Sequence, residues 1–591
     1  MLGLRKEKTP VLVVGGGVAG ISTAAFLAAY GLASVLIERR PGTSTHPRAR
    51  GVNARTMELL AALGVDDRVR AADSARALAA NSGIRAMETL AGQEYGEMHA
   101  PYFVDPLVSL EHISPAGWCL CDQDELEPIL LERAVELGAD ARFGTALEHW
   151  TPSQDGDGVR AVVREAATDE VYEIEADYLV AADGGGSRVR QALGIGRTGA
   201  GTLAHYLNIH FHADLREALG ERRFILSYVV NSHLMGALVP VDNAVNWLLH
   251  VMYDPESGQS PDDFPEERCA ELVRAAAGLP GLDVKIKSVL PWEAAGLTAD
   301  SYRRDRVFLV GDAAHVMPPS GALGSNTGIQ DAQNLAWKLA MVARGQAGPG
   351  LLDSYEAERR PVAVATVEQA VLRSKDRPAM MGEESEAAEG IEPDHTVHFR
   401  QLYRSSAVSD ATAVTQPHQP ATASTATAST ATAITATAIT ATAGAAAGRV
   451  GGAFAGAEEH RSPWAEDCDG RPGTRAPHAR VSLAGRRIST IDLFGRSWTM
   501  VTGSAGPWAP AMAPVAARLG LEVPVYRLGV ELTDPDDRCA AVYGGAGTAT
   551  LVRPDGFVAW RSDRPSPDPE AALETALRAL LDRPRAAGER R

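Results

Sequence analysis

Short apolar runs alternate with alanine-rich stretches near the N-terminus of the chain. Val11–Val14 is a β-branched and aliphatic run, residues 18–30 are rich in alanine and precede Gly31, and residues 33–38 read ASVLIE. A short apolar run bounded by turn residues is typical of a buried strand, and glycine commonly follows the end of a helix. The pattern therefore predicts strand, helix and strand, which is the opening unit of a Rossmann-like α/β fold.

Two later apolar runs end in a turn that joins a glycine to an acid. The run within residues 172–195 ends at Asp183-Gly184, and the run 306–310 is followed by Gly311-Asp312. Open α/β sheets bind ligands outside the carboxyl ends of their strands. We therefore expect both turns to lie at the ligand-binding edge of the sheet.

Polar and apolar positions alternate in strand fashion over residues 200–295. In residues 203–213, one face carries Tyr206, Asn208, His210 and His212, and the opposite face is apolar. Such a period of two predicts half-buried strands, and three more apolar runs follow before residue 254. The pattern indicates a separate β-sheet domain.

The length of the chain requires more than one domain, because 591 residues exceed what a single core supports. One of the predicted domains, the α/β domain, is discontinuous in sequence. We place the α/β domain at 1–200 and 285–400, the sheet domain at 201–284, an Ala/Thr-rich linker at 405–450 and a C-terminal domain at 451–591. The linker repeats TATAS or TATAI and has almost no charged or large apolar residues, so it is expected to be disordered.

Charge and cysteine content narrow the function classes. The formal charge of −18 argues against nucleic-acid binding, which needs a basic surface. No apolar run is long enough to span a membrane, and three consecutive glycines in the first apolar stretch argue against a signal peptide. Five scattered cysteines without a CxxC pair suggest neither a zinc site nor a disulfide framework and fit a reducing cytoplasm.

The first strand–helix turn has the spacing of a dinucleotide-binding motif. Gly15, Gly17 and Gly20 match GxGxxG, and Glu38 follows Gly15 by 23 positions. The glycines let the backbone approach a pyrophosphate at a helix N-terminus, and the acid accepts from a ribose hydroxyl. A carboxylate there suits FAD or NAD and repels the extra phosphate of NADP. The neighbouring positions included in this predicted site are Val18, Ala19 and Arg39.

Two further polar residues are candidates for the same nucleotide. Arg48 or Arg50 could neutralise the pyrophosphate, although solvated helix charge explains either one equally well. Gln123 begins a helix predicted within residues 121–139, where it could turn toward a cofactor or simply cap the helix.

Together, the GxGxxG turn and the two glycine–acid turns resemble those of flavoprotein aromatic hydroxylases, the FAD monooxygenases typified by p-hydroxybenzoate and phenol hydroxylases. The match is strongest to the branch that tailors aromatic polyketides, and it covers residues 8–375. The resemblance implies FAD as the cofactor. The motif glycines and Glu38 would hold its ADP part, Asp183 would lie near its pyrophosphate, and Asp312 would bind its ribityl hydroxyls.

The segment after Asp312 fits this resemblance. Pro318 and Pro319 lack N–H groups and are stiff, and the family places their carbonyls beside the flavin ring. Unusual dihedrals at Gly321 and Gly324 would let the N–H groups of residues 323–326 meet the flavin pyrimidine, where negative charge develops on reduction. The positions that supply these groups are Leu323, Gly324, Ser325 and Asn326. His315 could be a base, but a structural role in its turn is favoured.

One departure from the family concerns this loop. The branch usually has Gly-Gly where Gly321-Ala322 stands, and Leu or Met where Ser325 stands. These changes bear on the mobility of the loop more than on flavin binding.

The alternating block resembles the substrate-binding sheet that covers the flavin in this family. The candidates to line its pocket are Tyr206, Asn208, Tyr228, Asn246, His250 and Trp292. The alternative for each polar residue is a position facing solvent or a packing helix, and Trp292 could belong to the core.

The resemblance also implies the reaction. NADPH or NADH would be a transient co-substrate, O₂ the oxidant, and a polycyclic aromatic polyketide or another phenol the substrate, with no metal. Oxygen insertion beside a ketone and hydroxylation that inactivates an antibiotic remain alternatives, and a flavin-binding protein without oxygen transfer is the alternative of another class.

The C-terminal domain resembles the thioredoxin-like domain of phenol hydroxylase relatives, with a Pro-Asp-Gly hairpin turn at 554–556. Because the redox CxxC is missing, we expect a structural role or a contribution to a homodimer. A redox relay through Cys468 and Cys539 is the alternative.

Overall fold

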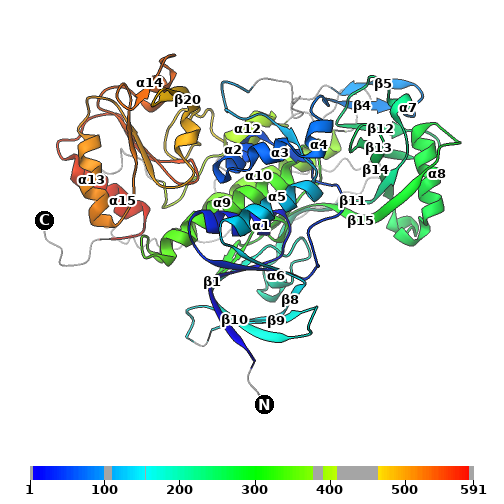
Figure 1. The fold of residues 1–591 in the computed structure, drawn as a ribbon, viewed down its shortest axis with the longest axis horizontal. Coiled ribbons are helices and arrows are strands. Elements are labelled where there is room, and N and C mark those ends of the chain that lie inside the picture. The colour runs from blue at the N-terminus through cyan, green and yellow to red at the C-terminus, as the bar shows by residue number, and fades with distance from the viewer. Residues whose placement is uncertain (1–3, 99–109, 154, 377–389, 409–463, 585–591) are drawn as a thin grey trace, which may run out of the picture.

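The computed structural model describes residues 4–98, 110–153, 155–376, 390–408 and 464–584. A central α/β domain lies between a mixed β-sheet on one side and the C-terminal domain on the other (Figure 1). The predicted linker lies outside the described residues from position 409 onward.

The central domain contains the predicted parallel sheet. Its parallel strands run in the order β17, β10, β1, β2 and β7. Their bounds are Lys6–Val14 for β1, Ser34–Glu38 for β2, Asp140–Phe143 for β7, Val171–Ala181 for β10 and Val307–Leu309 for β17. Because β1, β10 and β17 are parallel neighbours, the turns that follow them meet at one edge of the sheet. The antiparallel strands β9 (Val159–Glu165) and β8 (Thr145–Pro152) extend this sheet.

Four helices cover the parallel sheet and form the core with it. Helix α1 (Val18–Ala29) packs between α5 (Gln123–Glu136) and α9 (Leu323–Ala343), and α10 (Asp353–Lys375) lies along α9. The predicted strand–helix–strand unit is confirmed, since Val11–Val14 falls in β1 and is buried. The alanine-rich composition of α1 lets this helix approach the sheet and its neighbouring helices closely.

The mixed sheet is larger than the predicted insertion. Its order is β18, β15, β11, β14, β13, β12, β4 and β5. The strands of the insertion are β11 (Arg197–His212), β12 (Leu226–Val230), β13 (Met235–Pro240) and β14 (Asn246–Tyr253). The strands from outside it are β4 (Ile84–Met87), β5 (Glu94–Met98), β15 (Lys285–Ala299) and β18 (His315–Val316). Hydrogen bonding to distant strands, which periodicity cannot reveal, sets this boundary.

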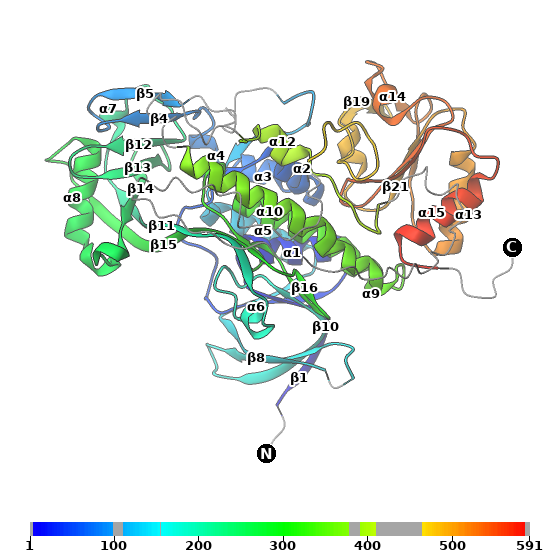
Figure 2. The ribbon, with the colours of Figure 1, turned by 180° about the vertical axis from the view of Figure 1, so that it is seen from behind.

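The alternation predicted for β11 separates its two faces. Leu207, Ile209 and Phe211 are fully buried in one cluster with Leu272 and Val273 of helix α8 (Glu266–Ala277). The opposite face of β11 is directed toward the central domain (Figures 1 and 2).

The C-terminal domain holds a four-stranded sheet, and helices α13 (Trp508–Leu519) and α15 (Pro569–Leu580) pack against each other on one side of it (Figures 1 and 2). The sheet order is β22, β21, β24 and β25, and only β21 and β22 are parallel. These strands span Thr499–Thr502 (β21), Val525–Arg527 (β22), Ala549–Val552 (β24) and Val558–Ser562 (β25). The Pro-Asp-Gly turn joins β24 to β25, as predicted for a hairpin. The thioredoxin-like comparison stays a prediction.

Buried ion pairs join the C-terminal domain to the central domain. Arg553 binds Glu358 of α10, with an Nη1–Oε1 distance of 2.6 Å. Arg475 donates from Nε to Glu58 Oε2 at 3.1 Å, and Glu58 lies in helix α2 (Ala54–Leu63). All four of these side chains are at most 1% exposed, so the two domains share a dry polar interface.

The described residues also bear on two features considered from the sequence, membrane-spanning helices and the state of the cysteines. Within them, no helix combines the length and the apolar character that crossing a bilayer requires. All five cysteines are free thiols, and burial raises the pKa of Cys539 to about 12 and also raises that of Cys468. Thiols that resist deprotonation are poor redox nucleophiles, which counts against the alternative of a relay.

Candidate active site

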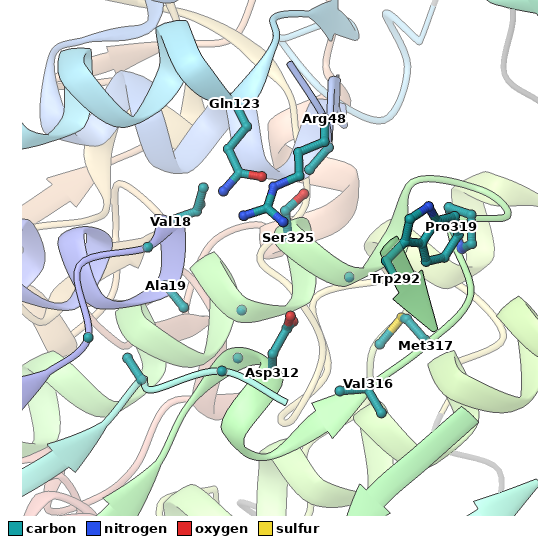
Figure 3. A pocket seen from close by; sticks show the side chains of 18 of the residues that line it. Val18, Ala19, Arg48, Gln123, Trp292, Asp312, Val316, Met317, Pro319 and Ser325 are labelled. Atoms are coloured by element: carbon teal, nitrogen blue, oxygen red, sulfur yellow. The ribbon is translucent and has the colours of Figure 1, made fainter. Parts of the chain in front are cut away.

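A cavity of about 1230 Å³ lies where the parallel strands end and the mixed sheet begins. Residues from all three glycine turns line it, together with polar and apolar side chains of the mixed sheet. Side chains from α1, α5 and α9 and from the Asp312 turn surround one part of it, and Trp292 and Pro319 lie near each other in another (Figure 3). The cavity is large enough for a dinucleotide-sized cofactor and a second molecule.

The surroundings of the three motif glycines explain why each of these positions lacks a side chain. A Cβ on Gly15, whose φ is +110°, would lie 2.3 Å from the Ala182 carbonyl oxygen, and one on Gly20 would lie 1.9 Å from the Gly15 carbonyl oxygen. A Cβ on Gly17 would have its nearest neighbour 3.9 Å away, at Glu127 Oε1. Gly15 and Gly20 are therefore required by the protein itself, whereas the space beside Gly17 is open for a ligand.

Glu38 is held rigidly at the end of β2. Its carboxylate accepts hydrogen bonds from the backbone N–H of Gly16 at 2.7 Å and of Arg40 at 2.8 Å, and it lines the cavity. The carboxylate keeps further acceptor capacity, so it can bind a ribose hydroxyl in a fixed geometry.

Gln123 and Arg48 approach the cavity from above the start of α1 (Figure 3). The Gln123 amide donates to Glu127 Oε1 at 2.5 Å, and Glu127 also accepts from the Ser44 N–H at 2.7 Å. Glu127 thus orients Gln123, whereas Arg48 is exposed to the cavity. Arg50 instead forms an ion pair with Asp122, at 3.1 Å between Nε and Oδ1.

The two glycine–acid turns place carboxylates in the same cavity. Asp183 accepts from Ser187 Oγ and from the Val189 N–H at 3.2 Å, which fixes the turn after β10. Asp312 projects into the cavity (Figure 3), and desolvation in this recess raises its pKa. A Cβ on Gly311 would lie 2.6 Å from Ala19 Cβ, so this turn packs tightly against α1.

His315 has a structural position. Its Nε2 lies 2.7 Å from Asp331 Oδ2, and Arg359 binds the other oxygen of Asp331 at 2.7 Å. His315 is 1% exposed and does not line the cavity. The hydrogen bond between His315 and Asp331 stabilises the turn that carries Asp312.

The loop from Pro318 to the start of α9 forms one wall of the cavity. Its lining residues are Pro318, Pro319, Ser320, Gly321, Ala322, Leu323, Gly324 and Ser325. Helix α9 begins at Leu323, and the first N–H groups of a helix have no intrahelical acceptor. They form a site for negative charge at the end of a 21-residue helix.

Asn326 supports this wall from behind. Its side chain accepts from the Asn53 N–H at 3.0 Å and donates to the carbonyl oxygens of Gly51 at 2.7 Å and Ala322 at 2.6 Å. It is 2% exposed and does not line the cavity, so its side chain fastens the start of α9 to the 51–53 segment.

The mixed sheet contributes one row of neighbouring side chains. Asn208 of β11 pairs in register with His250 of β14 and with Leu290 of β15, and all three line the cavity. Tyr228 of β12 also lines it. Burial lowers the pKa of His250 to about 4, so this histidine is neutral at physiological pH.

Two of the residues predicted to line the substrate pocket lie outside the cavity lining. Tyr206 is not a lining residue; its ring stacks on Trp292, with centroids 4.7 Å apart, and thereby orients a residue that does line the cavity. Asn246 donates to Asp242 Oδ2 at 2.6 Å at the start of β14 and is also outside the lining.

Sequence reasoning missed several lining residues, among them His46, Trp118 and Arg373. Arg373 lies in α10, and a Cβ on Gly321 would be 2.3 Å from its Nη1. No spacing rule connects residue 373 to a loop at 321, because only the packing of α10 brings them together. His46 directly precedes the Arg48 segment and could have been included as its neighbour.

The residues present fit a flavin dinucleotide. The cavity combines an open glycine cradle at Gly17, a fixed ribose acceptor at Glu38 and a second helix N-terminus at Leu323. Within the described ranges, no group of histidine, cysteine and carboxylate side chains is arranged to hold a metal ion. Fold and site thus define the class of FAD-dependent oxidoreductases of Rossmann-like architecture.

Comparison with known proteins narrows this class to one family. A family model for an FAD binding domain matches residues 8–370, and one for the C-terminal domain of aromatic-ring hydroxylases matches residues 469–584. The chain belongs to the FAD-dependent aromatic-ring hydroxylases, and it is a flavoprotein monooxygenase.

The chain is similar to its relatives over nearly its whole length. It is 42% identical over 588 residues to a putative polyketide hydroxylase of Streptomyces halstedii, covering 97% of both chains. It is 39% identical over 587 residues to aklavinone 12-hydroxylase RdmE of Streptomyces purpurascens, covering 98% of this chain and 100% of that one. The crystal structure of an aklavinone-11 hydroxylase with FAD and aklavinone superposes with a TM-score of 0.81 at 38% identity, covering 97% of this chain and 99% of that one.

Proposed function

We propose that this protein hydroxylates a polycyclic aromatic, polyketide-type substrate, using FAD, NADPH or NADH, and O₂. The observation that carries the proposal is a single cavity that joins the nucleotide cradle at Gly17 to the aromatic and apolar wall of the mixed sheet. Relatives named as polyketide and aklavinone hydroxylases support the substrate class.

The nucleotide part of the cavity would hold the cofactor through separate groups. Gly17 would admit the pyrophosphate, Glu38 would accept from the adenosine ribose, and Asp312 would bind the ribityl chain. Arg48 would offset phosphate charge, and Gln123, oriented by Glu127, would donate to the same region. FAD, when bound, supplies the redox chemistry that lets O₂ react with an aromatic ring.

The N-terminus of α9 would stabilise negative charge on the cofactor. Its free N–H groups and its dipole favour an anion, and the rigid Pro318-Pro319 segment next to it contributes carbonyl oxygens and no N–H. The start of α9 is held in place without the ligand, because Asn326 fastens it from behind to the carbonyl oxygen of Gly51.

The sheet side of the cavity would hold the substrate and exclude water. Trp292, held by its stack on Tyr206, offers an aromatic face, and Leu290 and Pro291 add apolar contacts. Such positioning, with water excluded, accounts for much of the rate that an enzyme adds to a bimolecular reaction.

One experiment separates hydroxylation from the alternatives. We expect purified, FAD-loaded protein to oxidise NADPH faster when a polycyclic phenol is added, and to form a product heavier by one oxygen. Mass spectrometry of the product and assay of hydrogen peroxide measure this coupling. Equal NADPH oxidation with and without the aromatic, with all oxygen recovered as peroxide, would support a flavin-binding protein without oxygen transfer. An ester or lactone product would instead indicate oxygen insertion beside a ketone.

A further inference from the structure

Arginines of the C-terminal domain hold a short segment of the central domain, residues 111–114. Arg475 donates from Nη1 to the Ile113 carbonyl oxygen at 3.1 Å, and Arg538 donates from Nη2 to the His112 carbonyl oxygen. Hydrogen bonds from a charged donor are stronger than those from a neutral one, and here they bind the backbone itself. The path of residues 111–114 therefore depends on the C-terminal domain.

The two ends of this segment are held as well. Ser114 Oγ donates to Glu58 Oε1 at 2.6 Å, and Glu58 is the carboxylate that binds Arg475 in the domain interface. Arg480 forms an ion pair with Glu111, at 2.9 Å between Nη2 and Oε2, and both side chains are exposed. Because exposed ion pairs contribute little, the buried contacts dominate this attachment.

The held segment leads to Trp118, which lines the cavity. A Cβ on Gly51 would lie 3.1 Å from Trp118 Cζ3 and 2.5 Å from Ala322 Cβ. The indole ring therefore lies close to the residue that precedes α9, at the wall proposed to stabilise negative charge on the cofactor.

The C-terminal domain also reaches the indole ring through helix α12 (Asp394–Phe399). The His398 ring lies edge-on to the Trp118 ring, at 5.4 Å between centroids, and the Arg475 guanidinium lies 4.9 Å from the ring centroid of Phe399. Helix α12 packs on α2, on the side of the central domain that faces the C-terminal domain (Figures 1 and 2). Arg475 thus contacts both the segment that precedes Trp118 and the helix that packs against its ring.

We propose that the C-terminal domain positions Trp118 in the cavity wall and thereby tightens the binding of FAD. Arg475 and Arg538 are positioning residues, since neither lines the cavity. They fix the ring before the cofactor arrives, so binding does not bear the cost of ordering it. The inference rests on the cofactor placement proposed above, does not depend on the reaction, and gives the C-terminal domain a role in the site.

The position of the ring can be followed by fluorine NMR of FAD-loaded protein labelled with 5-fluorotryptophan. The resonance of Trp118 is the one that Trp118→Phe removes. We expect Arg475→Lys, which cannot bind Glu58 and the Ile113 carbonyl together, to shift or broaden this resonance. The double variant Arg480→Ala/Arg538→Ala should do the same, and it spares the buried interface should the lysine variant fail to fold. The resonance of Trp247, which is buried in the mixed sheet, should not move.

The affinity for FAD, measured by titration of the full-length apoprotein, tests whether the arginines act through Trp118. We expect each arginine variant, and Trp118→Ala, to raise the Kd about threefold or more. In a Trp118→Ala background the arginine changes should add almost nothing, because residues that act through one side chain are not additive. A general loosening of the protein would instead weaken binding equally in both backgrounds.

The matched control is Arg486→Ala/Arg487→Ala, in the exposed turn between β19 (Arg480–Leu483) and β20 (Arg486–Ser489). Neither side chain makes a hydrogen bond or an ion pair within the ranges that the structure describes, so both measurements should be unchanged. An unmoved Trp118 resonance, an unchanged Kd in Trp118→Ala, or arginine effects that persist without the indole ring would each overturn the proposal. If these readouts behave as expected and no hydroxylated product forms, the proposed function is refuted and this inference stands.

Discussion

At the scale of single residues, the glycines of the first turn differ in what they accommodate. Gly17 faces open space, and Gly20 contacts the backbone of Gly15 so closely that any Cβ would collide with it. In this motif, Gly17 leaves space for the ligand and Gly20 permits the fold. Substitution of each glycine should therefore have a different effect.

We expect Gly17→Ala to leave the folded protein intact and to weaken FAD binding at least about tenfold, because the methyl group occupies the space of the pyrophosphate. Gly20→Ala should instead lower the thermal stability or prevent folding. Thermal unfolding and the flavin content after purification measure the two effects. Unchanged FAD binding in Gly17→Ala would show that the cradle is placed elsewhere.

Buried neutral histidines make stability depend on pH. Burial lowers the pKa of His210, His250 and His478 to about 4 and that of His398 to about 3. An unfolded histidine titrates near 6.5, so between these values the unfolded chain binds more protons than the folded one. The free energy of unfolding therefore rises with pH across this window. The stability that depends on these neutral histidines is lost as the pH falls from about 6.5 toward 4.

His398→Phe tests this at one residue. The ring lies edge-on to Trp118 at 5.4 Å between centroids, and its Nε2 has no partner among the described residues, so phenylalanine can replace it. We expect the slope of the unfolding free energy between pH 4.5 and 6.5 to decrease by about 1.4 kcal/mol per pH unit. Urea unfolding at several pH values measures it; parallel curves for the two proteins would contradict the assignment.

At the scale of elements, the start of helix α9 carries an unusual backbone. Ala322 precedes the helix with φ +53° and ψ +39°, a left-handed conformation that costs a non-glycine residue about 1–2 kcal/mol. A Cβ on Gly51 would lie 2.5 Å from Ala322 Cβ, so the two segments are in close contact. The hydrogen bond from the Asn326 side chain to the Ala322 carbonyl oxygen helps to hold this strained residue in the cavity wall.

We expect Ala322→Gly to stabilise the protein by up to about 1 kcal/mol, since relief of the left-handed strain exceeds the added entropy of the unfolded chain. Ala322→Val should destabilise it, because a β-branched residue tolerates this conformation poorly. Chemical unfolding of the three proteins gives the order. A glycine variant less stable than the wild type would show that the alanine methyl group contributes more through packing.

At the scale of the whole molecule, buried charges fasten the C-terminal domain to the helices behind the active site. Burial alone would raise the pKa of Glu58, but the Arg475 and Arg55 guanidiniums outweigh it and lower that pKa. Helix α2, which carries Glu58, begins at the Asn53 cap that Asn326 contacts. The C-terminal domain therefore supports the cavity wall from a distance, without lining it.

Glu58→Gln should destabilise the protein by about 3–5 kcal/mol, because it leaves two buried guanidiniums without their countercharge. The matched control is Glu136→Gln, which removes surface ion pairs with Arg68 and Arg133 and should cost less than about 1 kcal/mol. Urea unfolding of both variants checks the difference. Similar losses in the two would contradict the idea that the domain interface depends on Glu58.

The sequence by itself determined the strand–helix–strand unit that opens the chain, the glycine cradle and the acidic turns after β10 and β17. Each of these depends on residues that are neighbours in the chain, so their spacing carries the information. The tertiary structure alone decided the extent of the mixed sheet, the exclusion of Tyr206 and Asn246 from the cavity, and the placement of His46 and Arg373 in it. These depend on strand register and helix packing between distant segments, which no local pattern encodes.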